Sequence, residues 1–215
     1  MKLKHVELVM VSIENITQGE PVVATGLVPA AMGFKQGSYF PNGNTTLAQK
    51  YFNKDLLELE LSLDNLPPLT LIYIAGDRND AIAQAVQQQW EMVLGVKINL
   101  KAIERKVYFD KISKIDFELA AGSWIADYKD PMNFLEVFKY KTGGANNTGW
   151  ENPRYTALLD LASSAVNPQE RSLFLQDSEA VLMEEMPIIP VFLLHDALYA
   201  ELTSQRCCID KSGQY

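Results

Sequence analysis

The sequence has very little histidine and cysteine. Its 215 residues include two histidines, His5 and His195, at opposite ends of the chain, and two cysteines, the adjacent Cys207 and Cys208. A structural zinc site needs about four such ligands in spaced pairs, so a Cys/His metal centre is excluded. Adjacent cysteines close only a strained ring, which argues against a disulfide between them. No metal or other cofactor is therefore expected.

Positive charge and long apolar runs are also scarce. The chain has 19 Lys and Arg against 27 Asp and Glu, a formal net charge of −8, with no local cluster of basic residues. The negative net charge repels phosphate backbones, so nucleic acid is not expected as a partner. No apolar run reaches the roughly 18 residues that span a bilayer. Glu7 and Glu14 interrupt the apolar stretch after Met1, so no export signal is expected.

The remaining composition is that of an ordinary globular protein, with 47% hydrophobic and 21% charged residues. Its length suits one large domain or two small ones. Apolar residues at steps of three and four predict helices over 3–16 and 45–61, and the Gly- and Pro-rich stretch 22–44 predicts an ordered loop. We expect a single lobe in which residues 1–44 pack on an α/β ligand-binding part, 45–215.

The middle of the chain carries the clearest pattern. Residues 69–75 form a short apolar run rich in β-branched side chains, typical of a buried strand. A helical pattern follows up to Leu94, and Gly95 stands where a C-terminal glycine belongs. Apolar and polar residues then alternate over 96–101, as in a second strand. Strand, helix and strand with short connections predict a parallel βαβ unit, and hence an α/β fold with a mixed, largely parallel sheet flanked by helices.

Further elements are predicted along the second half. A short helix over 107–112 precedes a strand over 117–121, and 187–194 reads as a strand that Pro190 confines to an edge or a bulge. Three helix starts combine a capping side chain with a proline at the first helical position: Asp130-Pro131, Asn152-Pro153 and Asn167-Pro168.

Patterns for catalysis are weak. The sequence has no Gly-x-Ser-x-Gly elbow and no phosphate-binding glycine loop. Paired carboxylates occur at Asp127 with Asp130 and at Glu184 with Glu185, but such pairs are common on solvated surfaces. A glycosidase that uses Asp127 and Asp130 is the only enzymatic alternative, and we do not expect an enzyme.

One segment, residues 121–135, stands apart because Trp124 and Asp127 directly follow a predicted strand. In the simpler interpretation, Trp124 is a core aromatic and Asp127 caps a turn. In the functional interpretation, an exposed strand end takes up an extended peptide through main-chain hydrogen bonds, beside an aromatic wall and an anionic anchor. Asp127 would then bind the ammonium group of the peptide.

The segment Gly122–Glu136 resembles the ligand-binding strand motif of the oligopeptide-binding proteins of bacterial ABC importers, the family 5 extracellular solute-binding proteins. Other stretches are similar to that family in the same order, and together they extend from about Val6 to about Tyr199: residues 17–29, 66–73, 82–90, 94–96, 146–150 and 188–191. This resemblance identifies the chain as part of a solute receptor of periplasmic binding-protein architecture.

The resemblance implies roles for individual residues. Ser123, Trp124 and Ile125 would pair with the peptide backbone, and Asp127 would hold the α-ammonium. The implied partners are an oligopeptide and the permease of an ABC importer, and the implied location is the periplasm. Many relatives carry an arginine two or three residues before the tryptophan, where this sequence has Ala121 and Gly122, so that contact with acidic ligand groups is not carried over.

The family folds as a two-lobed clamp, and the resemblance covers its C-terminal lobe without the N-terminal lobe. Three alternatives follow: a binding lobe of a receptor, a split or truncated protein that binds only with a separate N-terminal lobe, or an inactive relic. An exposed apolar patch where that lobe would pack is expected for the second.

Overall fold

The computed structural model describes residues 22–32, 39, 43–193 and 198–204. The predicted helix over 3–16, both histidines and both cysteines lie outside these residues. No described helix combines the length and the apolarity that crossing a membrane requires.

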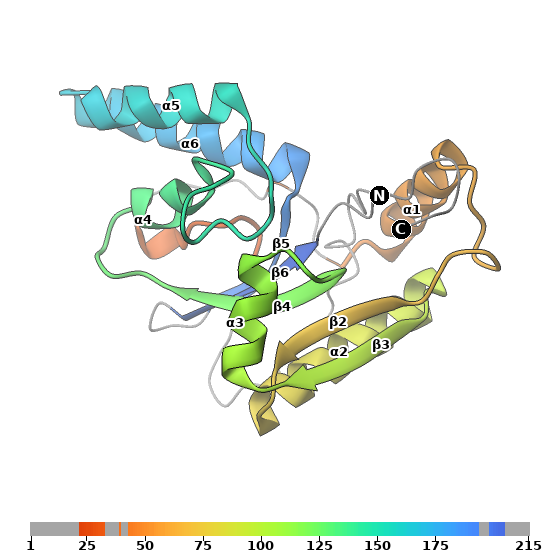
Figure 1. The fold of residues 1–215 in the computed structure, drawn as a ribbon. Coiled ribbons are helices and arrows are strands. Elements are labelled where there is room, and N and C mark those ends of the chain that lie inside the picture. The colour runs from red at the N-terminus through yellow and green to blue at the C-terminus, as the bar shows by residue number, and fades with distance from the viewer. Residues whose placement is uncertain (1–21, 33–38, 40–42, 194–197, 205–215) are drawn as a thin grey trace.

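The described chain forms a mixed α/β fold around one six-stranded sheet (Figure 1). The strands lie in the order β1-β5-β6-β4-β2-β3. The pairings of β2 with β3 and β4 are parallel, whereas β1–β5, β5–β6 and β6–β4 are antiparallel. The bounds are β1 Val22–Val23, β2 Leu69–Ile74, β3 Ile98–Ile103, β4 Leu119–Ile125, β5 Ile188–Leu193 and β6 Leu198–Ser204. The predicted α/β class with a mixed sheet is confirmed.

Helices flank the sheet, and α5 and α6 lie side by side above it in Figure 1. Their bounds are α1 Thr45–Glu58, α2 Asp77–Leu94, α3 Arg105–Ser113, α4 Met132–Leu135, α5 Pro153–Ser164 and α6 Pro168–Glu185, with short 3-10 turns at η2 Ala30–Met32 and η3 Glu136–Phe138. The side chains of Asn152 and Asn167 each accept bonds from two backbone amides of the first turn. The predicted caps of α5 and α6 are therefore confirmed.

The predicted βαβ unit is β2, α2 and β3. Leu69 pairs with Ile98 and the parallel register runs to Ile74 and Ile103. Gly95 ends α2 with a φ of 71°, and its N–H donates to the Glu91 carbonyl. Only a residue without a side chain adopts this left-handed conformation cheaply, which is why the helix stops here.

The two faces of the sheet support separate apolar clusters. Leu71 and Tyr73 of β2 point into the main core with Trp90 of α2. Ile72, between them in β2, points to the opposite face, where it packs with Tyr108 of α3. This alternation, the period-two pattern of a strand, places α2 on one face of the sheet and α3 on the other.

Two strands differ in detail from the sequence-based expectation. β5 lies between β1 and β6, and its register with β6 shifts between Pro190 and Phe192. The proline therefore occupies a bulge, the second of the two predicted places. β4 continues to Ile125, beyond the predicted end at residue 121, because β6 pairs with it over its whole length.

A buried carboxylate attaches the loop after β1 to α6. Glu179 is fully buried, and its Oε1 accepts bonds from the amides of Leu27 at 2.7 Å and Val28 at 2.8 Å. Its Oε2 accepts a bond from the Tyr39 hydroxyl at 3.2 Å. Burial and the neighbouring Glu179 raise the pKa of Tyr39 well above its usual range, so the phenol is a hydrogen-bond donor at neutral pH.

Candidate functional site

The last four residues of β4 have a strand on one side only. Pairing with β6 continues to Ile125, which lies opposite Leu198. Pairing with β2 ends where Tyr73 meets Ala121. Past this point β2 does not pair with β4, because the Asn79 side chain donates a hydrogen bond to the Ile74 carbonyl at 2.9 Å and the chain turns into α2. Within the described residues, Gly122–Ile125 therefore forms an open strand edge.

Backbone alternation decides which residues this edge offers. Residues two apart along a strand direct their N–H and C=O groups to the same side. The Ala121 carbonyl faces the open side, where it accepts a bond from the Tyr108 hydroxyl at 2.9 Å. Ser123 and Ile125 therefore present their N–H and C=O groups at the open edge, whereas the backbone groups of Trp124 face β6. Of the three adjacent residues named from the sequence, Ser123 and Ile125 therefore offer backbone groups at the open edge. Trp124 offers only its side chain.

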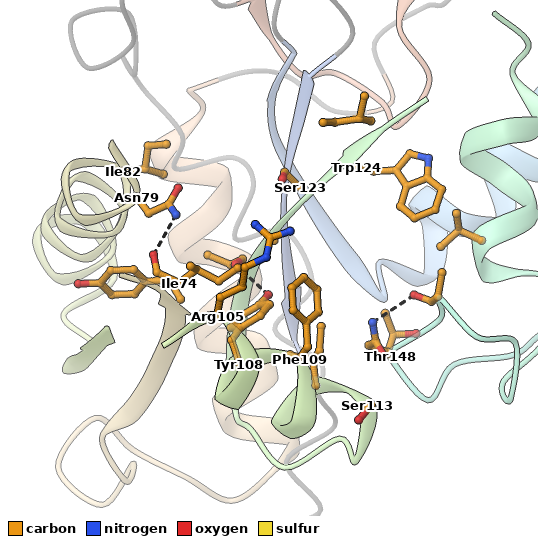
Figure 2. Close-up of a pocket in the computed structure, with 18 of the residues that line it drawn as sticks. Ile74, Asn79, Ile82, Arg105, Tyr108, Phe109, Ser113, Ser123, Trp124 and Thr148 are labelled. Carbon is orange, nitrogen blue, oxygen red and sulfur yellow. Dashed lines mark hydrogen bonds between the residues drawn. The ribbon is translucent and has the colours of Figure 1, made fainter. Parts of the chain in front are cut away.

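A hollow of about 870 Å³ borders this edge, and Ser123, Trp124, Ile125 and Asp127 all line it. The structure therefore brings together the four residues that the sequence singled out. The other walls come from the start of α2, from α3 and from the loop at 144–148 (Figure 2). Its size is that of pockets which take small ligands.

Trp124 lies half-buried at the end of β4. Its indole Nε1 donates to the side-chain oxygen of Asn133 at 3.0 Å, and Asn133 of α4 is only 2% exposed. The buried partner orients the ring, so Trp124 forms an aromatic wall of the hollow while it also packs against the main core.

The two carboxylates of the segment have different environments. Asp130 accepts bonds from the Met132 amide at 2.8 Å and from Arg171 at 2.9 Å. Burial raises the pKa of Asp130, but Arg171 and the Met132 amide outweigh it, so the pKa lies below its usual value. Asp127 is exposed and forms no hydrogen bond or ion pair with any described residue. The capping role expected for Asp127 in the simpler interpretation therefore belongs to Asp130.

Asp130 is also unsuited to the enzymatic alternative. A glycosidase needs one carboxylic acid that stays protonated at working pH, with a raised pKa. The pKa of Asp130 is lowered, and its Oδ1 is already engaged by an arginine and a backbone amide. Asp130 is therefore unsuited to the role of the proton donor.

Sequence reasoning missed the cationic wall of the hollow. Arg78 and Asn79 come from the first turn of α2, and Arg105, Tyr108 and Phe109 come from α3. One signal could have found them. In a parallel βαβ unit, the residues that follow successive strands meet at the carboxyl edge of the sheet, where α/β proteins bind ligands. Arg78 follows β2 and Arg105 follows β3.

An α/β fold with a hollow at the carboxyl ends of its parallel strands defines a ligand-binding lobe. The family model described as "Bacterial extracellular solute-binding proteins, family 5 Middle" matches residues 12–146. The chain belongs to this family, whose members are binding proteins that act outside the cytoplasm.

Individual relatives agree with this assignment. The chain is 38% identical over 188 residues to the oligopeptide-binding protein OppA of Bacillus subtilis, an alignment that covers 86% of this chain and 34% of the relative. A crystal structure of a peptide-binding protein of a peptide ABC transporter is 26% identical, with a TM-score of 0.78, and covers 88% of this chain and 89% of its own. The fold is shared with the Escherichia coli murein tripeptide-binding protein MppA at a TM-score of 0.79 and 22% identity, over 95% of this chain and 40% of that one. The chain spans about a third of the length of the B. subtilis relative.

Proposed function

We propose that the chain is a peptide-binding lobe of a solute receptor for an ABC peptide importer, acting in the periplasm and delivering its ligand to the importer's permease. The observation that carries the proposal is the open edge of β4 at Ser123 and Ile125, which borders the hollow. A peptide that adds itself to this edge gains main-chain hydrogen bonds that do not depend on its sequence.

Asp127 completes this binding mode. It follows the carboxyl end of β4, lines the same hollow and forms no hydrogen bond or ion pair within the described part of the chain. Its carboxylate is therefore available to the α-ammonium of a peptide. A peptide with its first residue at Asp127 runs antiparallel to β4, along Ile125 and then Ser123. This ammonium contact is exposed, so its contribution is about 0–1 kcal/mol.

The test follows backbone amide NMR signals during titration of the 215-residue chain with Ala-Ala-Ala. We expect the largest shifts at Ser123 and Ile125, and weaker binding after Asp127→Asn. Binding of N-acetylated Ala-Ala-Ala should be the same for both proteins, since the acetylated peptide has no ammonium. Asp64→Asn, an exposed carboxylate outside the hollow, is the matched control. Equal losses for both peptides would remove the ammonium role, and the absence of shifts at β4 would contradict the proposal.

A second candidate is a lobe that binds peptides only after it pairs with a separate N-terminal lobe. The observation in its favour is the apolar surface at and beside the hollow, where Phe109 is 47% exposed, Ile125 57% and Tyr128 50%. Exposed apolar patches of this kind mark interaction surfaces. A chain that stays monomeric at high concentration and does not enhance the fluorescence of an apolar dye would contradict this candidate.

A further inference from the structure

The loop between η3 and α5 is held by hydrogen bonds rather than by apolar contacts. Its residues 141–149 include no apolar side chain larger than alanine. The side-chain nitrogen of Asn146, a residue only 6% exposed, donates to the carbonyls of Tyr140 and Trp150, each at 3.0 Å. Its Oδ1 accepts bonds from the Thr148 amide at 3.1 Å and the Thr148 hydroxyl at 2.7 Å. One buried side chain therefore joins both ends of the loop to its middle.

This network presents Asn147 to the hollow. Asn147 stands between the buried Asn146 and the buried Thr148, and it lines the hollow. Its Nδ2 donates to the Ala145 carbonyl at 3.2 Å, and because a carbonyl only accepts, this bond fixes which end of the amide is the nitrogen. No described residue donates a hydrogen bond to the Oδ1 of Asn147. The loop therefore offers an oriented acceptor to a ligand in the hollow.

The attachment of the loop indicates which part of a bound peptide it meets. The residues at its two ends, Phe138 and Trp150, belong to the main core, against which Trp124 also packs. The loop therefore lies on the Trp124 face of the sheet, whereas α3 covers the opposite face. In a peptide that pairs with Ser123 and Ile125, the intervening residue lies opposite Trp124. Because cross-strand neighbours direct their side chains to the same face, the side chain of that peptide residue points towards the loop.

We propose that Asn147 is a specificity-determining residue of the hollow and that Asn146 is the residue that positions it. The Oδ1 of Asn147 accepts a hydrogen bond from a hydroxyl or carboxamide on the side chain of the peptide residue opposite Trp124. This inference rests on the proposed peptide-binding function. An apolar side chain in the same place displaces water from the Oδ1 without replacing its bond, so it binds less well. Asn146 acts only through the loop, because its own amide is fully engaged.

Four variants of the 215-residue chain separate the two roles. Asn147→Ala removes the acceptor and leaves the network of Asn146 in place. Asn146→Ala removes that network, and the double variant carries both changes. Thr148→Val removes only a hydroxyl of the same network, and it replaces Asn146→Ala if that variant does not fold. Asn53→Ala, at an exposed position of α1 outside the hollow, is the matched control and should bind peptides like the wild type.

The probes are Ala-Gln-Ala and Ala-Met-Ala, followed by NMR at the Ser123 and Ile125 amides. Their middle side chains are similar in length, but only the glutamine carries a donor. In a tripeptide that pairs with both positions, the middle residue lies opposite Trp124. We expect Asn147→Ala to weaken binding of Ala-Gln-Ala by about threefold to tenfold and to leave Ala-Met-Ala unchanged. Asn146→Ala should reproduce this selective loss and should add little to it in the Asn147→Ala background.

The outcomes separate this inference from the proposed function. If Asn147→Ala weakens both peptides equally or neither of them, the acceptor role is wrong and peptide binding stands. If Asn146→Ala weakens both peptides equally, or if its effect adds in full to that of Asn147→Ala, the positioning role is wrong. If neither peptide shifts the β4 amides, peptide binding is wrong and the role of Asn147 is rejected with it.

Discussion

The indole Nε1 of Trp124 donates to the Asn133 side chain at 3.0 Å, and this bond joins the open end of β4 to α4. Asn133 is buried, whereas Trp124 is half-exposed in the hollow. An aromatic ring that lines the hollow therefore takes its orientation from a buried residue. We therefore expect a change at Asn133 to alter the orientation of the Trp124 ring in the hollow.

Loss of this bond should lower stability measurably. We expect Asn133→Ala to reduce the free energy of unfolding by about 1–3 kcal/mol, since a buried polar contact is removed. Urea unfolding measures the loss. The same substitution made on Trp124→Phe should cost less, because phenylalanine has no indole N–H to leave unpaired. Equal losses in the two backgrounds would show that Asn133 acts independently of Trp124.

Glu179 should contribute strongly to attachment of the loop at 22–32. Glu179→Gln replaces a charged acceptor of two backbone amides by a neutral one, with an expected loss of about 1.5–3 kcal/mol in urea unfolding. Glu184→Gln, an exposed position on the same helix, is the control and should change stability little. If both variants lose the same free energy of unfolding, the buried hydrogen bonds to Leu27 and Val28 contribute nothing beyond the effect of removing one negative charge from the helix.

The Asp130–Arg171 pair should make stability sensitive to acid. The folded-state pKa of Asp130 is lowered, so the pair stabilises the fold at neutral pH, and this contribution disappears as the pH falls through that lowered pKa. We expect Asp130→Asn to cost about 1 kcal/mol at pH 7, reduced by the partial exposure of both side chains. Near pH 2 it should match the wild type. Asp127→Asn, three residues earlier, is the matched control at pH 7, because it removes a carboxylate that has no ion pair within the described residues.

Tyr39 should make stability sensitive to alkali. Its folded-state pKa is raised by burial and by Glu179, whereas the unfolded chain ionises near the ordinary tyrosine value. Stability is therefore complete below about pH 10 and falls as the pH rises beyond it. Tyr39→Phe should be less stable than the wild type at pH 7, because the bond to Glu179 is lost, and should lose less stability above pH 10. Parallel curves for the two proteins would contradict this assignment.

Local chemistry accounts for what the sequence predicts well. The caps Asn152 and Asn167 bond amides two and three residues away, so their role depends on neighbours in the chain. The βαβ unit likewise consists of elements that are consecutive in the chain, and Gly95 alone indicates where its helix ends. These caps and this βαβ unit could therefore be predicted without knowing which distant segments of the chain pair with each other.

Distant contacts account for what the sequence misses. The extension of β4 to Ile125 depends on β6, which is some 75 residues further along the chain and for which no strand is predicted. The proximity of Arg78 and Arg105 depends on the parallel pairing of β2 and β3. Alternate residues of a strand direct their backbone groups to opposite sides. Which side Ser123, Trp124 and Ile125 face depends on how β4 pairs with its neighbours, and composition does not encode that pairing.

The open edge of β4 has a cost as well as a use. The backbone groups of Ser123 and Ile125, to which the proposed function assigns a peptide, can also pair with the edge strand of another protein molecule, and the Ile125 side chain beside them is 57% exposed. Pro190 and the bulge of β5 lie on the other side of β6, so they do not protect this edge. Under the proposed function, we expect the empty lobe to be more prone to self-association than the lobe with a peptide bound along this edge.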